Sequence, residues 1–233
     1  MTHAEGFPVA EGGFGFFGRV ETDTFFTMPA AFQLLPHRGS QEFYDGSLQP
    51  TALNLYEIET WQRHRWSIFD PSYRQTLTKK MKKMFSQDWQ QRFDNFLAER
   101  EAYLKVVLTR ARLFSEALDK KADLATVLKV FIFAGDCERT LRAALIAEEN
   151  GQVKTFFRAR KMKGNGLTQS MVEAKLFEPG DGRITRRSAL TISYGESISD
   201  KTNLSFSMFG CEIHGDLPNN LIFQDNLLSI LIK

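Results

Sequence analysis

Cysteine is scarce in this chain, and its scarcity excludes two common ways of stabilising a small fold. Only Cys137 and Cys211 occur among the 233 residues. Two cysteines are too few for a disulfide framework, and no CxxC or Cys/His cluster has the ligand spacing of a structural zinc site. Both cysteines lie beside apolar runs, so we expect them to be buried thiols. The sequence therefore predicts no metal site, and it implies no cofactor.

Long apolar runs and a strong net charge are also lacking. No run reaches the roughly 18 apolar residues of a membrane-spanning helix. The N-terminus has no basic flank followed by an apolar stretch, which favours a cytoplasmic location unless an export signal was lost with a missing N-terminal segment. The net charge of +2 gives no electrostatic footprint for nucleic acid.

One local basic run, KKMKKMF, extends from Lys79 to Phe85. We expect a solvated helix face here. The alternative is a contact with a membrane or another anionic lipid surface.

Apolar residues are plentiful, at 42% of the chain with 21 Phe, so a sizeable core is expected. The clearest periodicity runs from about residue 88 to 118, where apolar side chains recur at three- and four-residue steps and predict one long helix. Residues 127–133 form a nearly continuous β-branched and aromatic run, typical of a parallel strand buried on both faces. The other expected elements are a short helix within 27–36, a hairpin pairing 153–160 with 171–177, a strand at 204–209, and a final helix capped by Asn219 or Asn220.

Alternating helices and strands predict an α/β fold, in which sites form on loops at the carboxyl ends of strands. Asp181 lies between two glycines after a β-like run, and His214 follows the strand at 204–209. An acid that precedes a histidine fits the last two members of a Ser–Asp–His triad. The imidazole would take the serine proton, and the carboxylate would fix its tautomer.

Other interpretations of these residues stay open. A GDG sequence is also a common turn, and a lone histidine after a strand is often only a surface residue. Asp136 is a rival acid, although a turn or a helix N-cap before ERTLRAAL is the simpler interpretation. Asp216, close to His214, is expected to cap or solvate its loop.

A nucleophile is not found. The chain contains no GxSxG sequence, the pattern that gives a catalytic serine the small neighbours it needs on its sharp strand-to-helix turn. The usual oxyanion-hole donor after that serine is missing with it.

Four stretches in order resemble the C-terminal part of the lecithin:cholesterol acyltransferase-like α/β-hydrolases. They are TMPAAFQLLP, VLKVFIFAGDCERT, FEPGDGRITRRSAL and IHGDLPNNLIFQDNLLSIL. The third is similar to the family's acid motif, and the fourth is similar to its C-terminal segment that contains the histidine. The resemblance implies a partial α/β-hydrolase fold over residues 1–233, made of the C-terminal strands and helices of a mostly parallel sheet, with a helical cap-like insertion at 37–120. The basic ITRRS segment and the long charged helix depart from the family pattern, which leaves the substrate least defined.

The resemblance also implies a function. Asp181 would be the triad acid and His214 the triad base of a serine-dependent ester hydrolase or acyltransferase that acts on lipid-like acyl esters. Its partner would be the missing N-terminal half of the fold, and we expect residues 1–233 alone to be inactive. The aromatic segment with Trp61, Trp66 and Phe69 would cover the acyl site, although plain core packing is the simpler expectation. The alternative function is a non-catalytic interaction module derived from the same fold.

Overall fold

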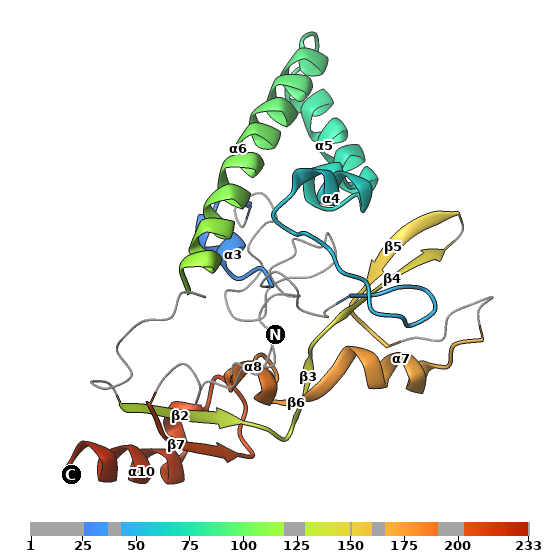
Figure 1. The fold of residues 1–233 in the computed structure, drawn as a ribbon. Helices are drawn as coiled ribbons and strands as arrows, with labels where there is room; N and C mark the ends of the chain where they lie inside the picture. Colours follow the sequence, from blue (N-terminus) through green and yellow to red (C-terminus); the bar gives the residue numbers. More distant parts are fainter. Residues whose placement is uncertain are drawn as a thin grey trace. The chain divides into compact units, whose positions relative to one another are not determined.

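The computed structural model combines helices with strands in small mixed sheets (Figure 1). It describes residues 26–36, 43–118, 129–149, 151–159, 166–190 and 203–232. The helices are α3 (Pro29–Gln33), α4 (Ile58–Arg63), α5 (Pro71–Met84), α6 (Trp89–Leu118), α7 (Gln169–Leu176), α8 (Arg186–Ala189) and α10 (Leu221–Leu231). The strands are β1 (Phe43–Tyr44), β2 (Lys129–Gly135), β3 (Glu138–Leu141), β4 (Ala144–Glu149), β5 (Gln152–Phe156), β6 (Phe177–Gly180) and β7 (Asn203–Gly210).

The described residues divide into two compact units. The helical unit contains residues 26–36 and 53–118, and the sheet unit contains the remaining described segments. The predicted cap-like region, 37–120, therefore contributes 53–118 to the helical unit and 43–52 to the sheet unit. That it forms a cap stays a prediction.

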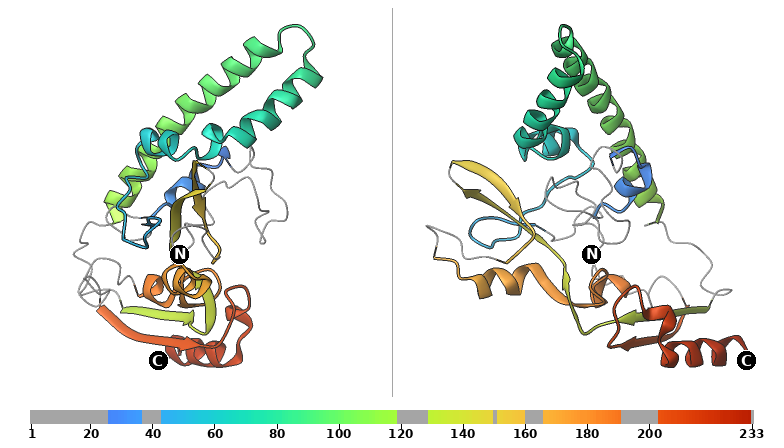
Figure 2. Two further views of the ribbon diagram at one scale, coloured as in Figure 1. Left: turned by 90° about the vertical axis from the view of Figure 1, so that its right-hand side faces the viewer. Right: turned by 180° about the vertical axis from the view of Figure 1, so that it is seen from behind.

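The long helix of the helical unit confirms the periodicity seen in the sequence. Its buried apolar residues, Leu104, Val107, Leu108 and Ala111, have the spacing i, i+3, i+4 and i+7 and so lie on one face. Helix α5 packs antiparallel to it, and the two form the hairpin seen in both views of Figure 2. Asp70 caps α5, because its side chain accepts hydrogen bonds from the backbone N–H groups of Ser72 and Tyr73. The described helices include none long and apolar enough to cross a membrane.

Trp61 lies at the centre of the aromatic segment. Its indole is fully buried and donates a hydrogen bond to the carbonyl oxygen of Leu55 at 2.8 Å. Its ring lies 6.0 Å from that of Phe32 and 5.9 Å from that of Trp66. These contacts favour core packing as the role of Trp61, since a buried indole with a satisfied N–H has nothing left to offer a ligand.

His64 makes the stability of the helical unit depend on pH. Its ring stacks on Trp66 at 5.0 Å, and both ring nitrogens are buried with no hydrogen-bond partner among the described residues. Burial, and secondarily the nearby Arg63, lower the pKa of His64 below its ordinary value of 6.5. The unfolded chain therefore binds a proton more readily than the folded one, so stability falls as pH decreases below about 6.5.

We expect His64→Phe to weaken this pH dependence, because phenylalanine keeps the stacking and cannot be protonated. Urea unfolding of both proteins at about pH 7.5 and pH 5.5 measures the effect. The wild type should lose more stability between the two pH values than the variant does. Equal losses would show that His64 is not the group responsible.

The sheet unit contains three small sheets. Strand β4 pairs parallel with β1 and antiparallel with β5. Strands β3 and β6 pair antiparallel, and β2 and β7 pair parallel, with Gly135 opposite Gly210 at their carboxyl ends. The expected strand at 204–209 is confirmed. The parallel pairing of the 127–133 run is confirmed for residues 129–133, while 127–128 lie outside the described residues.

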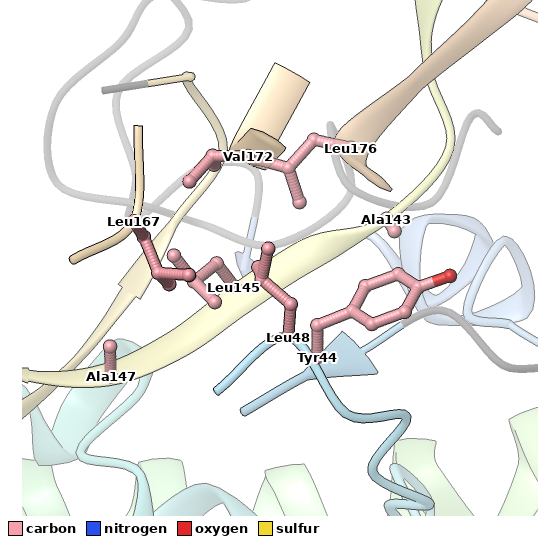
Figure 3. Close-up of a cluster of buried hydrophobic side chains, with 8 residues drawn as sticks. All are labelled: Tyr44, Leu48, Ala143, Leu145, Ala147, Leu167, Val172 and Leu176. Carbon is pink, nitrogen blue, oxygen red and sulfur yellow. The ribbon is translucent and has the colours of Figure 1, made fainter. Parts of the chain in front are cut away.

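A cluster of buried side chains joins β4 to α7 in this unit (Figure 3). Leu145 on β4 and Val172 and Leu176 on α7 are fully buried. Each such side chain contributes roughly 1.5–3 kcal/mol when it is removed from water. The other members are Tyr44, Leu48, Ala143, Ala147 and Leu167.

Two predictions about this unit are wrong. Residues 153–160 do not pair with 171–177. The first segment lies mainly in β5, which pairs with its neighbour β4, and the second lies mainly in α7, which Thr168 caps by accepting a hydrogen bond from the N–H of Met171. The run ending in β2 is also not buried on both faces. Phe131, Ile132 and Phe133 are half-buried, because β7 is the only described strand beside β2.

Candidate active site: an Asp–His pair

Asp181 lies in the tight loop that follows β6. It is 2% exposed, and its Oδ1 accepts hydrogen bonds from the backbone N–H of Arg183 at 2.9 Å and of Ile184 at 2.7 Å. Gly182 has a φ of +87°, which favours glycine, and its N–H donates to Oγ1 of Thr140 at 2.8 Å. The GDG sequence thus forms a turn, and that turn fixes a buried carboxylate.

His214 lies in the loop after β7 and reaches the second carboxylate oxygen. Its Nδ1 is 2.9 Å from Oδ2 of Asp181, and its backbone N–H donates to the carbonyl oxygen of Asp181 at 2.8 Å. Two hydrogen bonds therefore join the acid loop to the histidine loop. The two predicted site residues are brought together although 33 positions separate them.

The orientation of the imidazole determines what it can do. An ionised carboxylate only accepts hydrogen bonds, so in the neutral imidazole Nδ1 carries the proton and Nε2 keeps its lone pair. The His214 side chain is 38% exposed, whereas the carboxylate is buried. This arrangement suits a general base, because a group that approaches from outside can give its proton to Nε2.

A glycine at the end of β2 permits this approach of the loops. A Cβ on Gly135 would lie 2.8 Å from Cβ of Asp181 and would collide with the carbonyl oxygen of Glu212. Any larger residue would have to push the acid loop or the histidine loop away. Gly135 is therefore a part of the site that the sequence analysis missed.

Cys137 and Cys211 form a disulfide, so the prediction of buried free thiols is wrong. Their Cα atoms are 5.1 Å apart, and 74 positions separate them in sequence. Cys137 follows Gly135 at the end of β2, and Cys211 follows Gly210 at the end of β7. The parallel pairing of these strands, which the sequence does suggest, is the signal that could have brought the cysteines together.

The rival acids have other roles. Asp136 forms an ion pair with Arg186, at 3.3 Å between Oδ2 and Nη1, and no described bond joins it to His214. Its interpretation as a helix N-cap is also wrong, because the residues after it form β3. Asp216 is exposed and its side chain caps nothing in the following 3-10 helix (Leu217–Asn219), so of its two expected roles only solvation holds.

Glu212 and Asn220 support the histidine loop. Oε2 of Glu212 accepts a hydrogen bond from Nδ2 of Asn220 at 3.1 Å. Oδ1 of Asn220 accepts from the backbone N–H groups of Ile222 and Phe223, which confirms Asn220 as the N-cap of α10. Phe223 in turn packs against Phe133, with ring centroids 5.8 Å apart. The histidine loop is thereby attached to both α10 and β2.

The described site contains an acid and a base and no nucleophile. No described hydroxyl group lies within hydrogen-bond distance of Nε2 of His214, and the described thiols are joined in the disulfide. Within the described ranges, no cluster of three or more His, Cys, Asp and Glu side chains could hold a metal. The geometry therefore provides an acid–base pair that can accept and return a proton.

A scan against protein-family models and a search of curated proteins found no match to this chain. The resemblance to the lecithin:cholesterol acyltransferase-like hydrolases stays a prediction that rests on the four motifs.

Proposed function

We propose that this chain is the C-terminal portion of a serine-dependent ester hydrolase or acyltransferase that acts on lipid-like acyl esters. It supplies the acid Asp181 and the base His214, and a nucleophilic serine comes from a segment that this sequence lacks. The observation that carries the proposal is the 2.9 Å contact between Nδ1 of His214 and the buried carboxylate of Asp181.

In the proposed mechanism, Nε2 of His214 takes the proton from the serine hydroxyl as its oxygen attacks the ester carbonyl carbon. The carboxylate of Asp181 stabilises the imidazolium that forms. His214 then gives the proton to the departing alkoxide, which leaves an acyl-serine. Water or an alcohol, deprotonated by the same nitrogen, attacks that acyl group. The bond from the acyl carbon to the serine oxygen breaks, His214 returns the proton to that oxygen, and an acid or a new ester is released. No cofactor takes part.

Two structural features support the assignment to part of an α/β-hydrolase fold. His214 follows the carboxyl end of a parallel strand, where sites form in such folds. Helix α10 also exposes large apolar side chains to solvent, with Leu221 at 72% and Leu231 at 73%. A helix that is apolar on most sides is normally buried, so a further protein surface, which we propose to be the missing half of the fold, would cover it.

The alternative, a non-catalytic interaction module, draws on the same helix. An exposed apolar helix suits docking to a partner protein, and no GxSxG motif occurs in the sequence. A module of this kind has no need for a buried carboxylate aligned with a half-exposed histidine. The Asp181–His214 pair therefore favours the catalytic proposal.

The test is reconstitution. We expect the chain alone not to hydrolyse p-nitrophenyl esters at enzyme-like rates. Co-expression with the polypeptide encoded directly upstream should give ester hydrolysis and labelling of an upstream serine by a fluorophosphonate, and both should require His214. Hydrolysis by the chain alone that is abolished by His214→Ala would contradict the need for a second segment. An upstream region with no GxSxG motif would favour the interaction module.

A further inference from the structure

Helix α5, the turn after it and the start of α6, residues 71–92 and here named the tip of the α5–α6 hairpin, carry a net positive charge that the rest of the chain lacks. Residues 71–92 contain six Lys and Arg residues and one acid, Asp88, which gives a net charge of +5. The remainder holds 24 basic and 27 acidic residues, a net charge of −3. The small overall charge therefore conceals a strongly basic end on the helical unit. The basic residues are Arg74, Lys79, Lys80, Lys82, Lys83 and Arg92.

Apolar and aromatic side chains accompany these charges. Met84, the last residue of α5, is 69% exposed. Nζ of Lys82 lies 4.5 Å from the ring centre of Trp89, and the guanidinium of Arg92 lies 4.4 Å from that of Phe85. The expected solvated face is confirmed, because Lys79, Lys82 and Lys83 are exposed. Met84 adds an exposed apolar side chain at the C-terminal end of the same helix.

We propose that this tip is a docking surface for an anionic phospholipid bilayer. Lysines close to an anionic membrane surface each contribute about 1 kcal/mol of attraction. Met84 is placed to enter the boundary between headgroups and acyl chains, where aromatic residues with cationic neighbours are also favoured. Charge complementarity thus favours an anionic bilayer as the partner. The exposed methionine adds an apolar contact that stabilises binding to the bilayer.

A nucleic acid is the competing polyanion, and the geometry favours it less. Binding to single strands relies on aromatic faces that stack with bases. Here Lys82 lies over Trp89 and Arg92 lies over Phe85, so a face of each ring is already occupied. A nucleic acid would also gain nothing from Met84. The proposal uses no residue of the Asp–His pair and is independent of whether that pair is catalytic.

Vesicle binding by the full chain tests the proposal. We expect binding to vesicles of phosphatidylcholine with about 30% phosphatidylserine, little binding to phosphatidylcholine alone, and loss of binding between about 0.1 M and 0.5 M salt. Replacing Lys79, Lys82 and Lys83 with Gln should weaken partitioning on the order of 10- to 100-fold. Met84→Ser should weaken it at unchanged charge.

The matched control replaces Lys105, Arg110 and Arg112 with Gln. These three residues are exposed on α6 and lie outside the tip, so an equal loss of charge should have a much smaller effect. Helicity measured by circular dichroism identifies a variant that fails to fold, and Met84→Ser and the salt dependence then carry the test. The proposal is overturned if the wild type does not bind anionic vesicles, or if the control variant loses as much binding as the tip variant. It is also overturned if the tip lysines bind a DNA or RNA oligonucleotide and not the vesicles.

Discussion

Replacing Cys137 and Cys211 with alanine is expected to lower the melting temperature of the sheet unit by roughly 10–15 °C. The bridge closes a loop across 74 positions, and the chain-entropy estimate for such a loop is about 4.5 kcal/mol. For a chain of this size, each kcal/mol shifts the melting temperature by about 2–4 °C. The disulfide also lies at the ends of β2 and β7, where His214 follows Cys211 by three residues. Its loss should therefore loosen the histidine loop as well as destabilise the unit.

Thermal unfolding with and without a reducing agent measures this effect. The reduced wild type and the double alanine variant should melt at similar temperatures, and the variant should not respond to the reducing agent. Hydrogen exchange in the histidine loop should increase in both. Two free thiols titrated in the untreated folded protein, together with an unchanged melting temperature after reduction, would show that no bridge forms.

Asp181→Asn is expected to reduce kcat of the reconstituted enzyme about 10⁴-fold, the loss found when the acid of a Ser–His–Asp triad becomes an amide. One amide oxygen can still accept from the N–H groups of Arg183 and Ile184. The amide NH₂ then faces Nδ1 of His214 and donates to it, which moves the imidazole proton to Nε2. A protonated Nε2 cannot accept the serine proton.

Asp136→Asn is the matched control for this substitution. It removes the same charge from the nearby residue that pairs with Arg186, and kcat should stay within about three-fold of the wild type. Rates are measured on the reconstituted enzyme with a p-nitrophenyl ester. Loss of activity in Asp136→Asn, with retention in Asp181→Asn, would show that Asp136 and not Asp181 is the acid.

Local patterns predicted the elements that depend on local rules. The spacing of apolar residues predicted α6, and the cap at Asn220 follows from side-chain chemistry that needs no distant partner. The prediction of a hairpin that pairs 153–160 with 171–177 is wrong, because two segments on either side of a turn do not determine which strand each one pairs with. Strand β5 pairs with β4, and Thr168 starts a helix. The choice among pairing partners depends on tertiary packing, which periodicity does not contain.

The site likewise combines features that the local sequence predicted with features that depend on tertiary packing. The order of an acid before a histidine predicted Asp181 and His214, and the structure places them in contact. The contributions of Gly135, Glu212 and the disulfide were missed, because each depends on the carboxyl ends of β2 and β7 lying side by side. Cys137 and Cys211 have no local feature that marks them as partners. Only the parallel register, with Gly135 opposite Gly210, brings them together.

The most direct test of the acid–base pair is the tautomer of His214 in solution. Nitrogen-15 NMR of the histidine side chains at about pH 9, where a neutral imidazole is favoured, separates a proton on Nδ1 from one on Nε2. His214→Gln identifies the signal among the four histidines of the chain. We predict a neutral ring protonated on Nδ1 in the wild type and on Nε2 in Asp181→Asn. A wild-type ring protonated on Nε2, or one that does not change in Asp181→Asn, would contradict the pairing from which the proposed catalysis follows.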